Sequence, residues 1–440
     1  MTLRIGCGSG GAPDRVAPAE DLARDGRLDY LCFESLAERT LAQGHVARRS
    51  GGVGYSPKLD ARFRAVLPHC AHNGTKVLTN MGAADPHGAG EATARLANKL
   101  GLSLKIAVIE GDDVLSLIKP ETELTEMGGT VAGFGREPIA ANAYTGYEAM
   151  AEALSAGADV VIAGRVSDSS LFLAPIAHEL KIAPDDWNML ARGALVGHLL
   201  ECSTQVTGGY FADPGYKDVL GLDNLGYPLA EVAEDGSAIV TKLDGTGGCV
   251  TTLTVKEQLL YEVHDPAAYL TPDVSANFST TRIAEDGIDR IRVSGATGSV
   301  RPDRLKALVA FEGGYLAEGE IGYAGPGALD RAKLAAEVVQ KRMIERHGFN
   351  GELRLDLIGA ASLHASSRRQ SESEDIRLRG ALRSMDRKWA DMLMEEIESL
   401  WMGGPAGGGG FRGRVTPSVI TQPTFVNRTD VRCSIKWFMS

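Results

Sequence analysis

The 440-residue sequence has no apolar run that approaches the ~20 residues needed to span a bilayer. It also has no excess of basic residues, since 46 lysines and arginines stand against 57 aspartates and glutamates, a net charge of -11. A protein that binds nucleic acid through bulk charge needs a basic surface, so this class of protein is excluded. We therefore expect neither a membrane nor a nucleic acid among the partners.

Disulfide and export signals are also missing. No two of the six cysteines are close enough in sequence to form a CxxC pair. Scattered thiols of this kind are typical of a reduced protein and not of a disulfide framework. The first residues, MTLRIGCGSGG, contain no apolar signal core. Together these observations predict a cytoplasmic protein.

The composition that is present belongs to a globular chain. Apolar residues make up 44% and charged residues 23%, close to the globular average, which rules out a disordered protein. The length predicts two or three domains with sizeable cores. Glycine, with 53 residues, lies well above its average share of about 7%. This excess predicts many tight turns or close backbone approaches.

The first half of the sequence alternates strand and helix patterns. Continuous apolar runs predict strands that are covered on both faces, as in a parallel sheet. Helical spacing at 91–101 and 147–157 separates them, and each helix pattern stops at a glycine. We predict an α/β domain over 1–215 with a mostly parallel sheet, either doubly wound or a partial barrel. The predicted strands lie in 27–35, 75–82, 104–111 and 158–168.

The rest of the chain predicts a mixed connecting region over 216–300 and an α+β domain over 301–440. In this domain the order β-α-β-β-α-β suggests a ferredoxin-like element. Its glycine-rich loop, 403–410, with Arg412 nearby, is predicted to bind an anion, through Gly408 and Gly409 among others. Its edge strands need covering, so we expect association into a homo-oligomer.

Polar residues follow several predicted strands. In parallel α/β sheets the functional site lies beyond the carboxyl ends of the strands, so these side chains should converge. Carboxylates, an amide and an arginine at one rim predict general acid/base chemistry or metal binding. The candidates are Ser9, Glu34, Asn80, Glu110, Arg165 and Asp168, and the candidate ligands for a divalent metal are Glu34, Glu110 and Asp168.

Two further motifs carry alternative interpretations. His198 and Glu201 lie at i and i+3 of an apolar helix, where they could be a base with its orienting carboxylate, two metal ligands, or a core histidine with a partner. The turn that contains Gly247 and Gly248 allows a ligand to approach the backbone, or simply closes a hairpin.

The opening loop matches only the bare dinucleotide pattern, with Gly6, Gly8 and Gly11 as its glycines. A flexible turn at a strand end explains this loop equally well. The sequence therefore requires no redox cofactor. A divalent metal remains an alternative, and so does a CoA moiety on the substrate.

Long motifs occur in one order along the chain: IGCGSG followed by Asp14 and Arg15, LDYLCFESLAERT, ADVVIAGRVSDSSL, GHLLECSTQVTGGYF and GPAGGGG. In this combination the sequence resembles the acyclic terpene utilisation (AtuA-like) family over about 1–440. The resemblance implies a cytoplasmic catabolic protein that works beside enzymes of terpenoid acyl-CoA thioesters. The family motifs fall on Glu34, Arg39, Arg165, Asp168 and Glu201 and on the glycine loops, and they add Arg15 and Arg39 to the substrate-binding candidates.

These observations predict an enzyme that acts on an organic acid or its acyl-CoA thioester by hydration or dehydration, isomerisation or a lyase reaction. Glu34 or Glu110 would be the general acid or base, and Arg165 would hold a carboxylate or thioester oxygen. Asp168 would orient Arg165, and a glycine loop would hold CoA phosphates or an enolate oxygen. The alternatives are a metal-dependent lyase or hydrolase, and a non-catalytic binding or assembly subunit.

Overall fold

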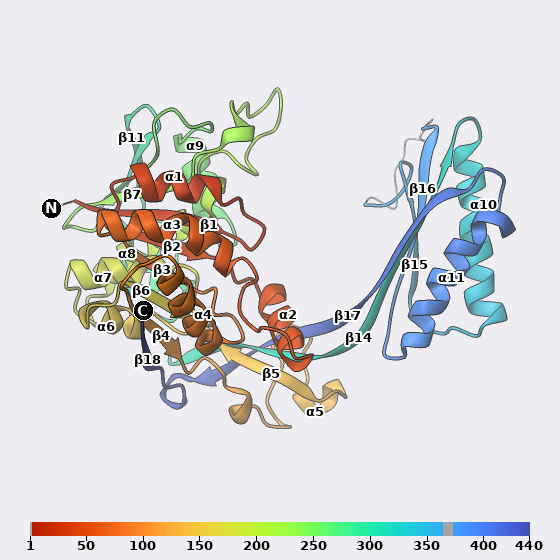
Figure 1. The fold of residues 1–440 in the computed structure, drawn as a ribbon, viewed down its shortest axis with the longest axis horizontal. Helices are drawn as coiled ribbons and strands as arrows, with labels where there is room; N and C mark the ends of the chain where they lie inside the picture. Colours follow the sequence, from red (N-terminus) through yellow and green to blue (C-terminus); the bar gives the residue numbers. More distant parts are fainter. Residues whose placement is uncertain (1, 364–372) are drawn as a thin grey trace. The chain divides into compact units, whose positions relative to one another are not determined.

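The computed structural model describes residues 2–363 and 373–440. The chain divides into two compact units, and each is described by itself (Figure 1). Unit 1 is Met1–Ala310 with Thr421–Ser440, and unit 2 is Phe311–Ile420. The strands β14 and β17 contain the two division points, so unit 2 is inserted in the sequence of unit 1.

Unit 1 is built on a ten-stranded sheet whose central strands are parallel. The central order is β1-β2-β3-β6-β4, and each neighbouring pair in it is parallel. These strands match the four predicted strand segments and the predicted first strand, which confirms the predicted parallel core. Their bounds are Leu3–Gly10 (β1), Tyr30–Glu34 (β2), Lys76–Thr79 (β3), Lys105–Glu110 (β4) and Val160–Ala163 (β6).

The sheet as a whole is mixed and not mostly parallel, which corrects the prediction. Antiparallel strands continue it beyond β1 in the order β7, β8, β12 and β11, and β18 pairs antiparallel with β4. The predicted range 216–300 thus shares its sheet with the predicted range 1–215. The sheet does not close into a barrel over the described residues. The added strands are Pro228–Val232 (β7), Ala238–Lys242 (β8), Arg282–Gly287 (β11), Arg290–Ser294 (β12) and Ser434–Met439 (β18).

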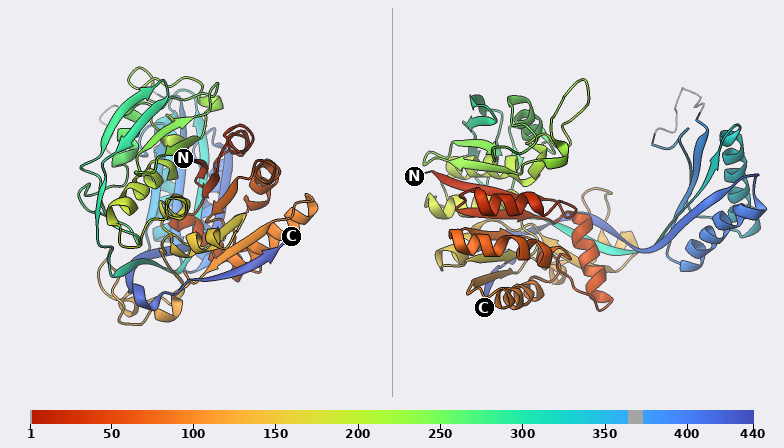
Figure 2. Two further views of the ribbon diagram at one scale, coloured as in Figure 1. Left: turned by 90° about the vertical axis from the view of Figure 1, so that its left-hand side faces the viewer. Right: turned by 45° about the horizontal axis from the view of Figure 1, so that its top comes forward.

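Helices cover both faces of the parallel strands, as the continuous apolar runs predicted (Figure 2). Leu31 and Phe33 of β2 face one core, which holds α1, α3 and α4. Tyr30 and Cys32 face the other core, which holds α6, α7 and α8. The bounds are Ala17–Asp25 (α1), Leu59–Asn73 (α3), Pro86–Lys99 (α4), Glu148–Ser155 (α6), Ser170–Glu179 (α7) and Trp187–Glu201 (α8).

Smaller elements complete unit 1. A three-stranded sheet has the order β13-β10-β9, and β5 pairs with β14. None of the helices in the described residues is long and apolar enough to cross a bilayer. The bounds are Glu38–Arg49 (α2), Val131–Phe134 (α5), Thr252–Leu260 (α9), Pro138–Ala143 (β5), Tyr269–Leu270 (β9), Ser275–Asn277 (β10) and Thr297–Ser299 (β13).

Unit 2 follows the predicted element order β-α-β-β-α-β, with the sheet order β15-β16-β14-β17. Residues of both helices pack on apolar residues of the sheet, including Ile321 and Leu378. The assignment to a ferredoxin-like element stays a prediction. The bounds are Arg304–Ala324 (β14), Ala328–Lys341 (α10), Leu353–Ile358 (β15), Asp375–Ser384 (β16), Arg387–Gly403 (α11) and Gly409–Asn427 (β17).

Strand β1 ends directly against the C-terminal end of α8. A Cβ atom on Gly10 would lie 2.4 Å from the carbonyl carbon of Cys202 and 2.5 Å from the backbone oxygen of Glu201. Backbone atoms cannot move aside as a flexible side chain can, so only glycine fits here. This contact brings the end of α8 to the carboxyl end of the parallel strands.

The variant Gly10→Ala should destabilise the protein by about 2–3 kcal/mol, because the added methyl group overpacks a rigid contact. Gly11→Ala is the matched control, since the nearest atom to its Cβ is Pro13 Cδ at 3.5 Å. Urea unfolding curves of the two variants measure the difference. Equal midpoints would mean that the end of α8 is not fixed against β1.

Candidate active site

The carboxyl ends of β1, β2 and β3 hold a connected group of polar side chains. Asn80 Nδ2 donates to Glu34 Oε1 at 3.0 Å, and the N–H of Leu36 donates to the same oxygen at 2.7 Å. Asn80 Oδ1 accepts from the N–H of Ser35 at 2.8 Å, and Ser9 Oγ donates to the backbone oxygen of Glu34 at 2.5 Å. The structure thus brings together three of the predicted site residues, Ser9, Glu34 and Asn80.

Glu34 is a carboxyl group held in its acid form. Its side chain is buried, with the residue only 7% exposed, and both donors above bind Oε1. In the described part of the chain, Oε2 has no hydrogen-bond partner, yet it is not among the solvent-inaccessible polar atoms. Burial, reinforced by the nearby charge of Asp168, raises the pKa of Glu34 to about 8. At neutral pH the side chain therefore keeps its proton, which Oε2 can present.

Arg165 follows β6 and is 1% exposed. Its guanidinium donates to the Asp168 carboxylate and to the backbone oxygens of Leu36 and Val166. The ring of Tyr144 lies 4.5 Å from its central carbon. Since the protein itself takes up these donors, Arg165 holds Asp168 and the chain after β2, and its predicted contact with a substrate oxygen stays a prediction.

Asp168 is the accessible member of this ion pair, with 39% of its side chain exposed. One carboxylate oxygen pairs with Arg165, which leaves the other open to a ligand. Loss of hydration raises the pKa of Asp168 above its usual value, although the charge of Arg165 acts in the opposite direction. Asp168 and Glu34 influence each other's ionisation, so the two carboxyl groups form one site, here called the Glu34–Asp168 site.

A buried chain of polar groups behind Arg165 was missed by the sequence reasoning. Asp112 Oδ2 accepts from the N–H of Arg165 at 2.8 Å and from Asn142 Nδ2 at 2.8 Å. Asn142 Oδ1 lies 2.7 Å from His45 Nε2. Burial raises the pKa of Asp112 to about 6. The strand-end rule could have found Asp112, because it comes two residues after β4.

A second missed group borders Asp168. Tyr144 donates its hydroxyl to Glu38, and Lys306 Nζ lies 3.3 Å from the same Glu38 oxygen and 4.7 Å from the centre of the Tyr144 ring. Burial alone would raise the pKa of Glu38, but the Tyr144 hydrogen bond and the charges of Lys306 and Arg165 lower it to about 2. Lys306 comes from β14, and no local pattern in the sequence links it to the rest.

His198 and Glu201 form the predicted pair, with Nδ1 and Oε1 at 2.9 Å. The rings of His198, Tyr269 and Phe278 pack against one another, with the His198 centre 5.2 and 5.7 Å from the other two, and in the described residues His198 Nε2 is buried without a hydrogen-bond partner. Burial raises the pKa of Glu201 to about 6, and the charge of Asp168 acts in the same direction. The pair therefore lies within electrostatic reach of the Glu34–Asp168 site. Neighbouring Cys202 is not poised as a nucleophile, because burial raises the pKa of its thiol.

The structure does not bring Glu110 to this site. Its strand, β4, is the third from β2 in the sheet, which puts the two strands roughly 14 Å apart. Glu110 instead pairs with His87 at 3.3 Å. Over the described residues, no three or more His, Cys, Asp or Glu side chains come together in a way that could hold a metal ion. The three candidate metal ligands, Glu34, Glu110 and Asp168, are thus not one ligand set.

The remaining candidates of unit 1 have contacts of their own. The Arg15 guanidinium donates to the backbone oxygen of Asp223 at 2.9 Å, and Arg39 is exposed near the start of α2. A Cβ on Gly247 would lie 2.0 Å from the Gly221 oxygen, and one on Gly248 would lie 2.3 Å from the Thr207 oxygen. Packing against protein backbone accounts for both glycines in this turn.

The candidates of the glycine-rich loop belong to unit 2. A Cβ on Gly408 would meet the Tyr323 ring at 3.2 Å, and Gly409 begins β17. Arg412 lines a cavity of about 390 Å³ together with Glu318, Glu320, Arg379 and Arg414. Arg414 is paired there with Glu318 at 2.7 Å.

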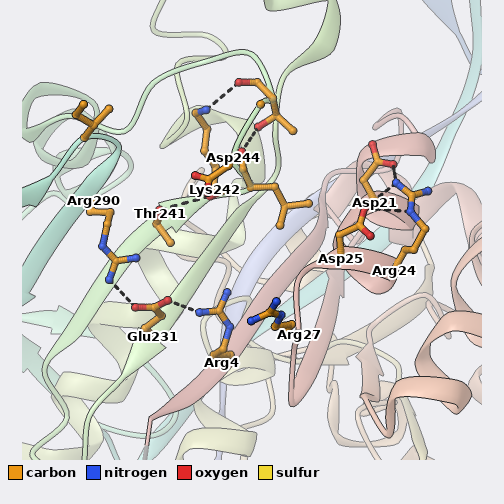
Figure 3. Close-up of a pocket in the computed structure, with 14 residues that line it drawn as sticks. Arg4, Asp21, Arg24, Asp25, Arg27, Glu231, Thr241, Lys242, Asp244 and Arg290 are labelled. Carbon is orange, nitrogen blue, oxygen red and sulfur yellow. Dashed lines mark hydrogen bonds and ion pairs between the residues drawn. The ribbon is translucent and has the colours of Figure 1, made fainter.

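A separate cavity of about 830 Å³ lies at the amino end of the parallel strands (Figure 3). Glu231 joins Arg4 and Arg290 across it, and Lys242 pairs with Asp289 at 3.2 Å. Arg4 stands six residues before Gly10 on β1, roughly 20 Å away along the strand. None of the predicted site residues lines this cavity.

Fold and site together define a mixed α/β protein with a two-carboxyl site at the carboxyl end of its parallel strands. A family model described as "Acyclic terpene utilisation family protein AtuA" matches residues 3–437. The chain therefore belongs to the acyclic terpene utilisation (AtuA) family, which confirms the resemblance drawn from its motifs. A comparison with curated proteins finds no match.

Because the pKa of Glu34 is raised, we predict that the stability of the folded protein depends on pH. The unfolded chain releases this proton near pH 4.3, whereas the folded chain holds it until about pH 8, so folding loses stability as the pH rises between these values. At pH 7 the loss is on the order of 3 kcal/mol. The variant Glu34→Gln removes the titratable carboxyl group. It should therefore stabilise the protein by about 3 kcal/mol at pH 7, but by little at pH 4.5.

Urea unfolding of wild type and variant across this pH range measures the effect. The exposed Glu121→Gln serves as the control and should give no pH-dependent gain. A Glu34→Gln gain that stays constant with pH would show that Glu34 ionises normally in the folded protein.

Proposed function

We propose that the protein is an acid/base enzyme of acyclic-terpene utilisation that acts on an organic acid or its acyl-CoA thioester. The observation that carries the proposal is the pairing of a buried, protonated Glu34 with an accessible Asp168 held by Arg165. Two neighbouring carboxyl groups in different environments, one with a cation against it and one with only neutral donors, can supply an acid and a base at one pH. This combination favours hydration or dehydration. The same acid/base chemistry would also serve an isomerisation or a lyase reaction.

In the dehydration direction, ionised Asp168 takes the proton on the carbon next to the carbonyl group. The electron pair of that C–H bond forms a carbon–carbon double bond, and the bond to the β-hydroxyl group breaks. Glu34 Oε2 gives its proton to the departing hydroxyl group, which leaves as water. Exchange with solvent then returns each carboxyl group to its starting state, and hydration follows the same steps in reverse.

The rest of the site supports these two roles. Arg165 keeps Asp168 ionised and oriented, and Asp112 and Asn142 hold the Arg165 backbone in turn. Asn80 and the Leu36 N–H fix Glu34 through Oε1, which leaves Oε2 for the proton transfer. No redox cofactor is needed for this reaction class. We further propose that the protein works in the cytoplasm and as a homo-oligomer, since the exposed edge strands of unit 2 favour pairing.

Exchange of substrate hydrogen with solvent tests this proposal without knowledge of the product. The protein is incubated in deuterated water with a panel of acyl-CoA thioesters and free acids, and deuterium next to the carbonyl group is measured by mass spectrometry. Glu34→Gln and Asp168→Asn should each lower the exchange rate about 100-fold or more.

Glu121→Gln should leave the rate unchanged, because this side chain is exposed outside the site. A comparable loss in Glu110→Gln would instead place the base at the end of β4. No exchange with any member of the panel would favour a binding or assembly subunit over an enzyme.

A further inference from the structure

We infer that Lys306, and not Arg165, binds the anionic group of the substrate, and that this group is a carboxylate. The inference rests on the proposed function and names its substrate class: organic acids with a free carboxylate close to the reacting carbon. The sequence around Lys306 does not mark this residue as functional, whereas its position in the structure does.

Arg165 is poorly placed to make this contact. The guanidinium is 1% exposed, and four of its five N–H donors go to the Leu36 and Val166 oxygens and to Asp168. A substrate carboxylate would have to displace these partners, and breaking a buried pair costs about 3–5 kcal/mol. The cation that recognises an anion must therefore come from another side chain.

Lys306 is an accessible cation beside the same site. Its side chain is 45% exposed, and its ammonium group has three donors, of which Glu38 takes one at 3.3 Å. It lies against the Tyr144 ring, which also touches Arg165. Its charge also acts on Asp168, so the ammonium group lies within electrostatic reach of that carboxyl group.

The backbone fixes Lys306 at this position. Its strand, β14, pairs with β5, and the N–H of Tyr144, the residue after β5, donates to the Lys306 oxygen at 2.8 Å. Tyr144 in turn holds Glu38 through its hydroxyl group. The ammonium group is thus placed by a strand pairing and a shared carboxylate, while its stem stays flexible enough to follow a ligand.

Lys306 is also the more accessible of the two cations. Its side chain is 45% exposed and pairs with Glu38, whereas the Arg165 side chain is 1% exposed and pairs with Asp168. An added ammonium–carboxylate hydrogen bond at a partly exposed position strengthens binding by about tenfold or more.

Calorimetric titration with hexanoate and with its neutral counterpart hexanamide tests the inference. Wild type should bind hexanoate at least about tenfold more tightly than hexanamide. Lys306→Met should remove this preference by weakening hexanoate alone, and Lys306→Arg should restore it. Hexanoyl-CoA tests the other source of negative charge, since loss of its binding in Lys306→Met, with hexanoate unaffected, would assign Lys306 to a CoA phosphate and overturn the carboxylate.

Lys105→Met is the matched control. Lys105 also lies over an aromatic ring, Trp437 at 4.5 Å, but at the opposite end of the parallel strands. It should leave both ligands unaffected. Equal binding of hexanoate and hexanamide by wild type, no detectable hexanoate binding, or unchanged hexanoate binding in Lys306→Met would each overturn the inference.

The two proposals fail in different measurements. Glu34→Gln should abolish hydrogen exchange but keep hexanoate binding, because the introduced amide cannot transfer the proton yet leaves Lys306 in place. If exchange persists in Glu34→Gln while Lys306→Met loses hexanoate, the acid/base proposal is wrong and the carboxylate site stands. If Glu34→Gln loses exchange but hexanoate binding does not depend on Lys306, the acid/base proposal stands and the carboxylate site is wrong.

Discussion

The site depends on satisfying one buried guanidinium group. An arginine removed from water costs several kcal/mol unless every donor finds an acceptor. Arg165 meets most of this demand with the backbone oxygens of Leu36 and Val166 and with the Asp168 carboxylate. The chain after β2 and the chain after β6 are thereby tied to one planar group. Glu34 and Asp168, which these two chain segments carry, lie within electrostatic reach of each other as a result.

Because the carboxyl groups of Glu34 and Asp168 affect each other, they differ in how readily each loses its proton. Asp168 has a cation against it, which favours its ionised form, whereas Glu34 has only neutral donors in contact and a negative neighbour. Since two adjacent carboxylates repel each other, the group with the weaker stabilisation keeps its proton. A structural requirement of the fold thus produces the pair of functional groups that an acid/base reaction needs.

Sequence reasoning found the residues that follow parallel strands and missed those that arrive from elsewhere. Glu34, Asn80, Arg165 and Asp168 were found because each ends or follows an apolar run. Lys306 was not, because it reaches the site through a pairing with β5, distant in sequence. The sequence also does not give the order of the strands across the sheet. In the structure β6 lies between β3 and β4, which places Glu110 farther from Glu34 than the chain order suggests. The mixed sheet was missed for the same reason, since antiparallel pairing such as β18 with β4 is set by tertiary packing.

The pairing of β18 with β4 has a consequence for how the protein is made. All of unit 2 lies between these two strands in sequence, so a ribosome completes β4 long before its neighbour exists. At common elongation rates the delay is on the order of tens of seconds. During that time β4 is an open strand edge with unpaired backbone groups, and such edges pair readily with other chains. Newly made chains therefore pass through a period in which β4 is exposed to aggregation, until β18 covers this edge.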